Sequence, residues 1–142
     1  MSPGNIDKDL EGQLFHILEH IISGRITKNN VSGIHRYEPR LHRILSVTQQ
    51  PNKHGVWEAK ISAYNSNRDE WIPKTRPSTF FPTHWTNEKL VLKIQEAFKT
   101  KTYINKTKYI GITSCNIEVV FILKDEKIIS IYPLYTSTQQ VL

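Results

Sequence analysis

Hydrophobic residues recur at three- and four-residue intervals in two stretches of the chain, and this spacing predicts two helices. The first covers residues 7–23, with Asp7 placed to cap its start and Gly24 to end it. Its apolar positions are Leu10, Leu14, Ile17, Leu18 and Ile21. The second begins after Thr86, a residue type that caps helices, and carries the apolar stripe Leu90, Val91, Ile94, Ala97 and Phe98. We expect this second stripe to pack in the core.

Residues with high β-propensity dominate most of the remaining chain. Stretches 44–49 and 56–64 are separated by turn-forming residues and predict a hairpin. The last third predicts strands over 109–114, 117–123 and 128–134, with a tight turn at 124–127 between the last two. Two segments predict no regular strand: 25–43, a loop around a short structured piece, and the proline-bracketed connection 73–82. The pattern therefore predicts an α+β fold in which helices come first and strands dominate the end.

The last predicted strand carries polar residues at alternate positions. Consecutive strand residues point to opposite faces, so Ile128, Ser130 and Tyr132 should share one face, and Ile129 and Ile131 the other. On this basis we expect Ser130 and Tyr132 to act as a pair.

Length and composition fit one globular domain over residues 1–142, with 1–6 as a flexible N-terminus. A single cysteine, Cys115, excludes an internal disulfide framework and a multi-cysteine zinc site, and we expect it to be a small buried residue. The sequence shows neither a signal peptide nor an apolar run of transmembrane length. If the protein is exported, we expect the address to lie on a larger polypeptide.

The charge balance favours polyanionic partners. Nineteen Lys and Arg against thirteen Asp and Glu give a net charge of +6, which favours binding to phosphate groups through counterion release. Many basic domains bind no nucleic acid, so an ordinary solvated surface is an equally open interpretation.

Four separate segments carry residues that could together cleave RNA without a metal. They hold His16, His35, Lys74 and the Ser130-x-Tyr132-Pro133 strand end. Two imidazoles can remove a proton from a ribose 2′-hydroxyl and donate one to the departing 5′-oxygen, because the histidine pKa lies near working pH. A lysine can stabilise the negative charge that develops on the phosphate.

Each of these residues also has an ordinary structural interpretation. A histidine in an apolar helix, such as His16, is more often packed and hydrogen-bonded than catalytic, and His20 lies one turn further on as a rival. His35 and Lys74 could be exposed surface residues, and Ser78 with Thr79 could cap a loop. The phenol of Tyr132 could simply pack at a strand end.

The combination nevertheless resembles the EndoU-like endoribonucleases, a group that contains the coronavirus uridylate-specific endoribonuclease, the animal poly(U)-specific enzymes and nuclease domains of bacterial polymorphic toxins. His16 in FHILEHI takes the place of the family's first catalytic histidine. His35 in SGIHRY matches the second, which follows a glycine-bearing turn. Lys74, with Ser78 four residues later, matches the family's Lys-x-x-x-Ser spacing.

The C-terminal half extends this resemblance. IEVVFILKDEKIISIYP is similar to the family's closing hairpin, and its (Thr/Ser)-x-Tyr-Pro ending is carried by Ser130, Tyr132 and Pro133. STFFPTHWTNEKLVLKIQEAF resembles the bacterial toxin branch, where a Phe-Pro-x-x-Trp segment leads into a helix. The chain departs from the pattern in two places: His20 stands where a glycine usually follows the first histidine segment, and the connection from His16 to His35 is long.

The resemblance implies an α+β fold with N-terminal helices and two antiparallel sheet elements forming a catalytic cleft. It implies a metal-independent endoribonuclease, with His35 as base and His16 as acid, that leaves 2′,3′-cyclic phosphate and 5′-hydroxyl ends. Tyr132, Ser130 and Ser78 would bind the substrate, an RNA with uridine preference for which tRNA is one candidate. Neither DNA nor a membrane is expected as a partner.

The bacterial branch further implies the C-terminal domain of a delivered toxin that acts in the target-cell cytoplasm and is neutralised by a cognate immunity protein. No cofactor is expected. A catalytically silent basic domain that binds RNA or a protein is the alternative from another functional class.

Overall fold

The computed structural model describes residues 13 and 16–137, and the predicted Asp7 cap and the expected flexible segment 1–6 lie outside this range. The N-terminal helix is described over residues 13 and 16–23. It is followed by β1 (Arg25–Ile26), β2 (Val31–Ser32), β3 (His42–Gln49), β4 (Trp57–Asn65), β5 (Glu70–Pro73) and β6 (Ser78–Phe80). The second half contains α2 (Asn87–Lys99), β7 (Thr102–Asn105), β8 (Lys108–Ile112), β9 (Glu118–Lys124) and β10 (Lys127–Pro133).

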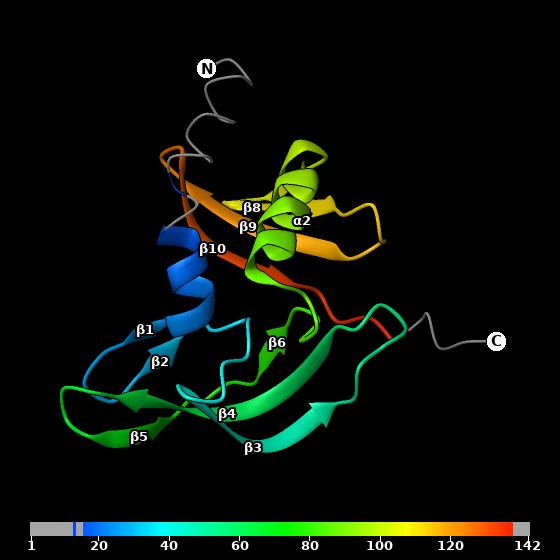
Figure 1. Ribbon diagram of the computed structural model, residues 1–142. Coiled ribbons are helices and arrows are strands. Elements are labelled where there is room, and N and C mark those ends of the chain that lie inside the picture. The colour runs from blue at the N-terminus through cyan, green and yellow to red at the C-terminus, as the bar shows by residue number, and fades with distance from the viewer. Residues whose placement is uncertain (1–12, 14–15, 138–142) are drawn as a thin grey trace.

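Two antiparallel sheets form the body of the molecule (Figure 1). In the first sheet the long strand β4 pairs with β3 on one side and with β5 and β6 on the other. The second sheet has the order β10-β9-β8-β7. A separate short hairpin is made by β1 and β2. The α+β prediction with two antiparallel sheet elements is therefore confirmed, with the β1–β2 hairpin in addition.

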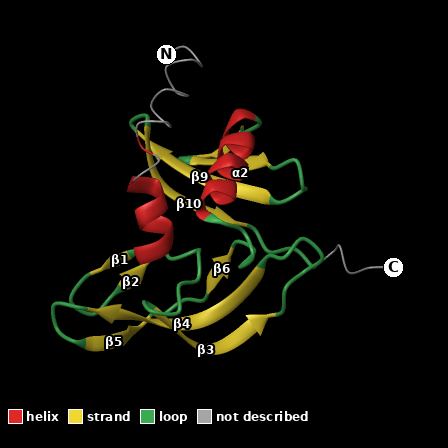
Figure 2. Cartoon of the chain, viewed as in Figure 1, coloured by secondary structure: helices red, strands yellow, loops and turns green. Residues whose placement is uncertain are grey.

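Helix α2 packs on the second sheet as its apolar stripe predicts (Figure 2). The hydroxyl of Thr86 accepts a hydrogen bond from the Lys89 amide at 3.1 Å and caps the helix. Four of the five predicted stripe residues are buried: Leu90, Ile94, Ala97 and Phe98. Val91 is only half-buried.

The N-terminal helix ends where the sequence predicts. Gly24 adopts a left-handed conformation (φ 64°), and its amide donates to the His20 carbonyl at 2.8 Å. A Cβ at this position would lie 2.4 Å from the Ser32 carbonyl oxygen, so only glycine allows β2 to pass this closely. The helix end is thus held against the segment that leads to His35.

The helix links the two sheets. Its residues Ile17 and Ile21 pack in the core of the second sheet. On its other side, the buried imidazole of His42 in β3 donates from Nε2 to the Ile22 carbonyl at 2.7 Å and accepts the Glu38 amide at Nδ1. Both ring nitrogens of His42 are therefore satisfied, and His42 is a structural histidine.

The expectation of irregular structure in residues 25–43 and 73–82 is wrong in part. The first segment contains the β1–β2 hairpin, and the second contains β6, which pairs with β4 through Ser78, Thr79 and Phe80. Strand β7 was also not predicted. These strands are two to four residues long, too short to show a period-2 pattern, and their positions come from pairing with longer neighbours.

A β-bulge in β10 corrects the predicted faces of this strand. Ile128 pairs with Leu123 and Ser130 with the adjacent Ile122, so Ile129 is an extra residue. As a result Ile128 and Ile131 both pack on the core, whereas Ile129 is 48% exposed. The prediction that Ile128 shares a face with Ser130 and Tyr132 is therefore wrong. The bulge turns the Ser130–Tyr132 pair away from the core.

Candidate active site

The end of the N-terminal helix and the turn before His35 are fastened together by backbone hydrogen bonds. The amides of His35 and Arg36 both donate to the Ile21 carbonyl, at 2.6 and 3.1 Å. The hydroxyl of Ser78, which is fully buried, donates to the Gly33 carbonyl at 3.2 Å. These contacts fix the backbone of His35 beside the last turn of the helix.

This arrangement brings His20 against the Gly33 turn. A Cβ on Gly33 would lie 3.0 Å from both Cε1 and Nε2 of the His20 ring, and Gly33 itself has a positive φ of 76°. Glycine is therefore required here both by the backbone conformation and by the neighbouring imidazole. The next residue, Ile34, also has a positive φ (69°), which is costly for a β-branched side chain.

Such a conformation typically costs about 1–3 kcal/mol and persists only where the surroundings impose it. Ile34 is completely buried in the core of the first sheet, which holds this turn in place. Strained residues of this kind cluster at functional sites.

His35 is buried and held in one tautomer. It is 8% exposed, and its Nδ1 lies 2.7 Å from the Thr79 carbonyl oxygen. Because a carbonyl can only accept, Nδ1 carries the proton and Nε2 of the neutral ring keeps a lone pair. Burial lowers the pKa of His35 to about 3, against the raising effect of the Thr79 hydrogen bond, with the positive charges of Lys74 and His20 adding to the decrease. The ring is therefore neutral, with the lone pair of Nε2 unprotonated.

Lys74 directly follows the end of β5, and its charge acts on His35. Its ammonium group donates to the carbonyls of Arg76 at 3.1 Å and Pro77 at 3.4 Å, which orients the side chain. Burial, and then the charge of Arg76, lower the pKa of Lys74. The charge of Lys74 in turn lowers the pKa of the His35 imidazole.

Tyr132 covers His35 from β10. The centroids of the two rings are 5.4 Å apart and the ring planes are inclined by 31°. Burial raises the pKa of the Tyr132 phenol, so it stays protonated and can donate a hydrogen bond. The ring also has an aromatic face that can stack on a base.

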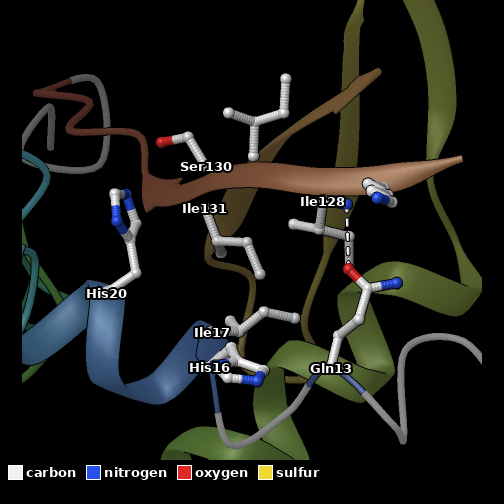
Figure 3. A pocket seen from close by; sticks show the side chains of 9 residues that line it. Gln13, His16, Ile17, His20, Ile128, Ser130 and Ile131 are labelled. Carbon is white, nitrogen blue, oxygen red and sulfur yellow. Dashed lines mark hydrogen bonds between the residues drawn. The ribbon is translucent and has the colours of Figure 1, made fainter. Parts of the chain in front are cut away.

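A cavity of about 350 Å³ lies between the N-terminal helix and β10 (Figure 3). Both His16 and His20 line it, together with Ser130. Figure 3 shows His20 beside Ser130, whereas His16 lies one helical turn away, near Gln13. The pKa of His20 is lowered by burial and by the charge of Arg25. His20, rather than His16, is thus the helix histidine that lies next to the His35 turn.

The structure brings together three of the six predicted site residues: His35, Lys74 and Tyr132. Ser130 lies beside His20 on the adjoining cavity. Ser78 is buried, with its hydroxyl bonded to the backbone. His16 is exposed and lines the same cavity one helical turn away from His20. Sequence reasoning kept His20 only as a rival to His16, although Gly24 at i+4 indicated that His20 lies in the last helical turn, where the chain reverses.

Comparison with known proteins identifies the family of the chain. A family model described as bacterial EndoU nuclease matches residues 16–135. The chain belongs to this family. A curated protein of Bacillus cereus named "Toxin" is 33% identical over 124 residues, which is 82% of this chain and 22% of that protein. The chain therefore spans about a fifth of the length of this relative. No solved structure matches the chain.

Two further findings concern the described part of this EndoU nuclease. Within residues 13 and 16–137, no helix is long and apolar enough to cross a membrane. In the same residues, no three His, Cys, Asp or Glu side chains are grouped so that they could hold a metal ion. The titratable groups around His35 are instead histidine, lysine and tyrosine.

Proposed function

We propose that this nuclease domain cleaves RNA by transphosphorylation, with His35 as general base and His20 as general acid. The observation that carries the proposal is the hydrogen bond from His35 Nδ1 to the Thr79 carbonyl. It leaves Nε2 of a neutral imidazole as the acceptor for the proton of a ribose 2′-hydroxyl. His20, whose ring lies against the Gly33 turn that precedes His35, supplies the second imidazole.

The reaction needs no external nucleophile. His35 takes the proton of the 2′-hydroxyl while the 2′-oxygen forms a bond to the adjacent phosphorus. The bond from phosphorus to the 5′-oxygen breaks, and this oxygen receives a proton from His20. The products are a 2′,3′-cyclic phosphate and a 5′-hydroxyl, and no metal-bound water takes part.

The acid role is assigned to His20 rather than His16 on position. The His20 ring lies against Gly33, two residues before His35, so we infer that one phosphate can lie within reach of both rings. His16 lies four residues before His20, about 6 Å away along the helix axis. A bound phosphate raises the pKa of a neighbouring imidazole, so the substrate itself favours the protonated form of His20.

Lys74 and the β10 residues Ser130 and Tyr132 complete the proposed site. The ammonium of Lys74 stabilises the charge that develops on the phosphate oxygens. Tyr132 holds the nucleoside next to His35, and Ser130 provides a polar contact on the side of His20. For Ser78 the bond to the Gly33 carbonyl supports a positioning role rather than contact with RNA.

The biological setting follows from the relative named "Toxin", of which this chain corresponds to about a fifth. We infer that the domain is the toxic C-terminal part of a larger bacterial polypeptide. It would be delivered to a competing cell and would act on RNA in the cytoplasm, with uridine preference and with tRNA as a candidate substrate. A cognate immunity protein would protect the producing cell.

The test is cleavage of a labelled single-stranded RNA in EDTA, with analysis of the product ends. The wild-type domain should cut and leave cyclic phosphate ends, whereas His35→Ala should not cut. The matched control is the same sequence with every ribose replaced by 2′-deoxyribose, which should remain intact. Cleavage of that deoxy substrate, or ends carrying a 3′-hydroxyl, would refute the mechanism. RNA binding without cleavage would instead indicate a catalytically silent binding domain.

A further inference from the structure

A second cavity, of about 410 Å³, lies at the N-terminal half of α2 and is lined almost entirely by basic and neutral residues. We call it the α2 cavity. Its titratable groups are Lys53, His54, His84, Lys89 and Lys93, together with Cys115, and no carboxylate lines it. None of these residues takes part in the proposed chemistry at His35.

Two elements build this cavity. Lys89 and Lys93 are four residues apart on one face of α2, and Trp85 lies just before the helix begins. The opposite wall is the loop of Lys53 and His54. The side-chain oxygen of Asn52, a buried residue, accepts the amide of His54 at 2.9 Å and that of Val56 at 3.1 Å, which holds this loop in place.

The cations of the α2 cavity differ in how far they are neutralised. Lys93 forms an ion pair with Glu96 at 3.3 Å and donates to the Ser114 hydroxyl at 2.8 Å, so it is engaged within the protein. Lys89 lies 5.8 Å from the Trp85 ring. No residue in the described part of the chain forms an ion pair with Lys53 or Lys89. These two ammonium groups therefore keep their charge available for an external anion.

The cavity is connected to the candidate active site through one short segment. The Phe81 amide donates to the His35 carbonyl at 2.9 Å. The next residue, Pro82, packs so closely on the Lys53–Gly55 loop that a Cβ on Gly55 would lie 3.1 Å from its ring. The segment of Phe81 and Pro82 thus contacts both the backbone of His35 and the loop that lines the α2 cavity.

We propose that the α2 cavity binds a phosphate group of the RNA substrate outside the linkage that is cut, chiefly through Lys53 and Lys89. This proposal rests on the proposed function, because it names a second contact for the same substrate. A small concave site lined by cations suits a phosphate and its ribose better than the broad surface of an acidic protein.

The experiment measures RNA binding separately from cleavage. Lys53→Glu/Lys89→Glu is compared with Lys28→Glu/Lys60→Glu, which makes the same charge change at exposed residues that line neither cavity. Both pairs are made in the His35→Ala background, and their affinity for a single-stranded RNA of about twenty nucleotides is followed by fluorescence anisotropy from low to high salt. Thermal unfolding of each variant verifies that it is folded.

Each lost phosphate contact should reduce the slope of log Kd against log salt concentration by about 0.7. The Lys53/Lys89 pair, which removes the one phosphate contact of this cavity, should therefore reduce the slope by about 0.7 and weaken binding at 0.1 M salt by about 5-fold. The control pair should change both by much less. In the active background, cleavage of a uridine-containing dinucleotide should be unchanged by Lys53→Glu/Lys89→Glu, whereas cleavage of the long RNA should decrease.

Equal slopes and affinities for the two pairs would overturn the proposal, and they are also the result expected if the cavity binds only an acidic protein. Failure of the proposed function has a different signature: the wild-type domain would cut neither RNA. A loss of RNA binding specific to Lys53 and Lys89 would support the α2 cavity even then.

Discussion

Burial of a neutral His35 predicts a specific loss of stability in acid. The pKa is about 3 in the folded protein and 6.5 for an unperturbed histidine. Between these values the unfolded chain binds a proton that the folded chain does not, so the free energy of unfolding falls as the pH decreases. At about 1.4 kcal/mol per pH unit, His35 alone should cost about 3 kcal/mol between pH 6.5 and pH 4.

The assay is urea unfolding followed by tryptophan fluorescence at pH 7, 5.5 and 4. His20 and His42 also have lowered pKa values and add to the loss, so the informative quantity is a difference between two proteins. His35→Asn can still donate to the Thr79 carbonyl but does not titrate. Between pH 7 and pH 4, the decrease in its free energy of unfolding should be roughly 3 kcal/mol smaller than the decrease for the wild type. Equal losses in both proteins would refute the buried, neutral state of His35.

Three further outcomes follow from the site geometry. Gly33→Ala should reduce cleavage severely, because its Cβ would displace the His20 ring, and circular dichroism should show a folded protein. Lys74→Met should lower kcat by roughly 10²–10³-fold, and Lys74→Arg, which keeps the charge, should lose less; steady-state kinetics on a dinucleotide measure both. Tyr132→Phe should retain most activity, whereas Tyr132→Ala should lose about 1–3 kcal/mol of stacking, seen as a decrease in kcat/KM. A phenylalanine variant as poor as alanine would assign the phenol hydroxyl, not the ring, to the substrate.

The long elements of the fold were predictable because their signals are local. The Thr86 cap, the apolar stripe of α2 and the Gly24 helix stop all depend on residues within a few positions of one another. The turn between β9 and β10 was predictable for the same reason, and Asp125 and Glu126 both adopt the positive φ that such a turn requires. Short strands such as β6 were not, since their pairing with β4 is a tertiary event.

The candidate site was predictable in its residue types but only partly in its members. His35, Lys74 and Tyr132 were selected from their motifs, and the structure places them together. The choice between His16 and His20 could not be made from helical periodicity alone, because residues four apart lie on the same face. The proposed choice of His20 rests on the position of its ring against the Gly33 turn and on the two hydrogen bonds to the Ile21 carbonyl, which join segments that are separate in the sequence.

The bulge in β10 is a second feature that the sequence could not predict. Strict alternation places Ile128 with Ser130 and Tyr132, and a single inserted residue, Ile129, reverses that assignment for Ile128. No side-chain pattern in KIISIYP distinguishes a bulged from a regular strand, since three isoleucines can occupy either face. The pairing of β10 with β9 determines where the bulge lies.

The most direct test of the catalytic assignment is the single-turnover rate of RNA cleavage by His20→Gln compared with His16→Gln. The two residues lie on the same helix and line the same cavity, so each substitution is the control for the other. His20→Gln should lower the rate by roughly 10²–10⁴-fold, the usual contribution of a general acid, and His16→Gln should stay within a few-fold of the wild type. A fully active His20→Gln together with an inactive His16→Gln would contradict the account and return the acid role to His16.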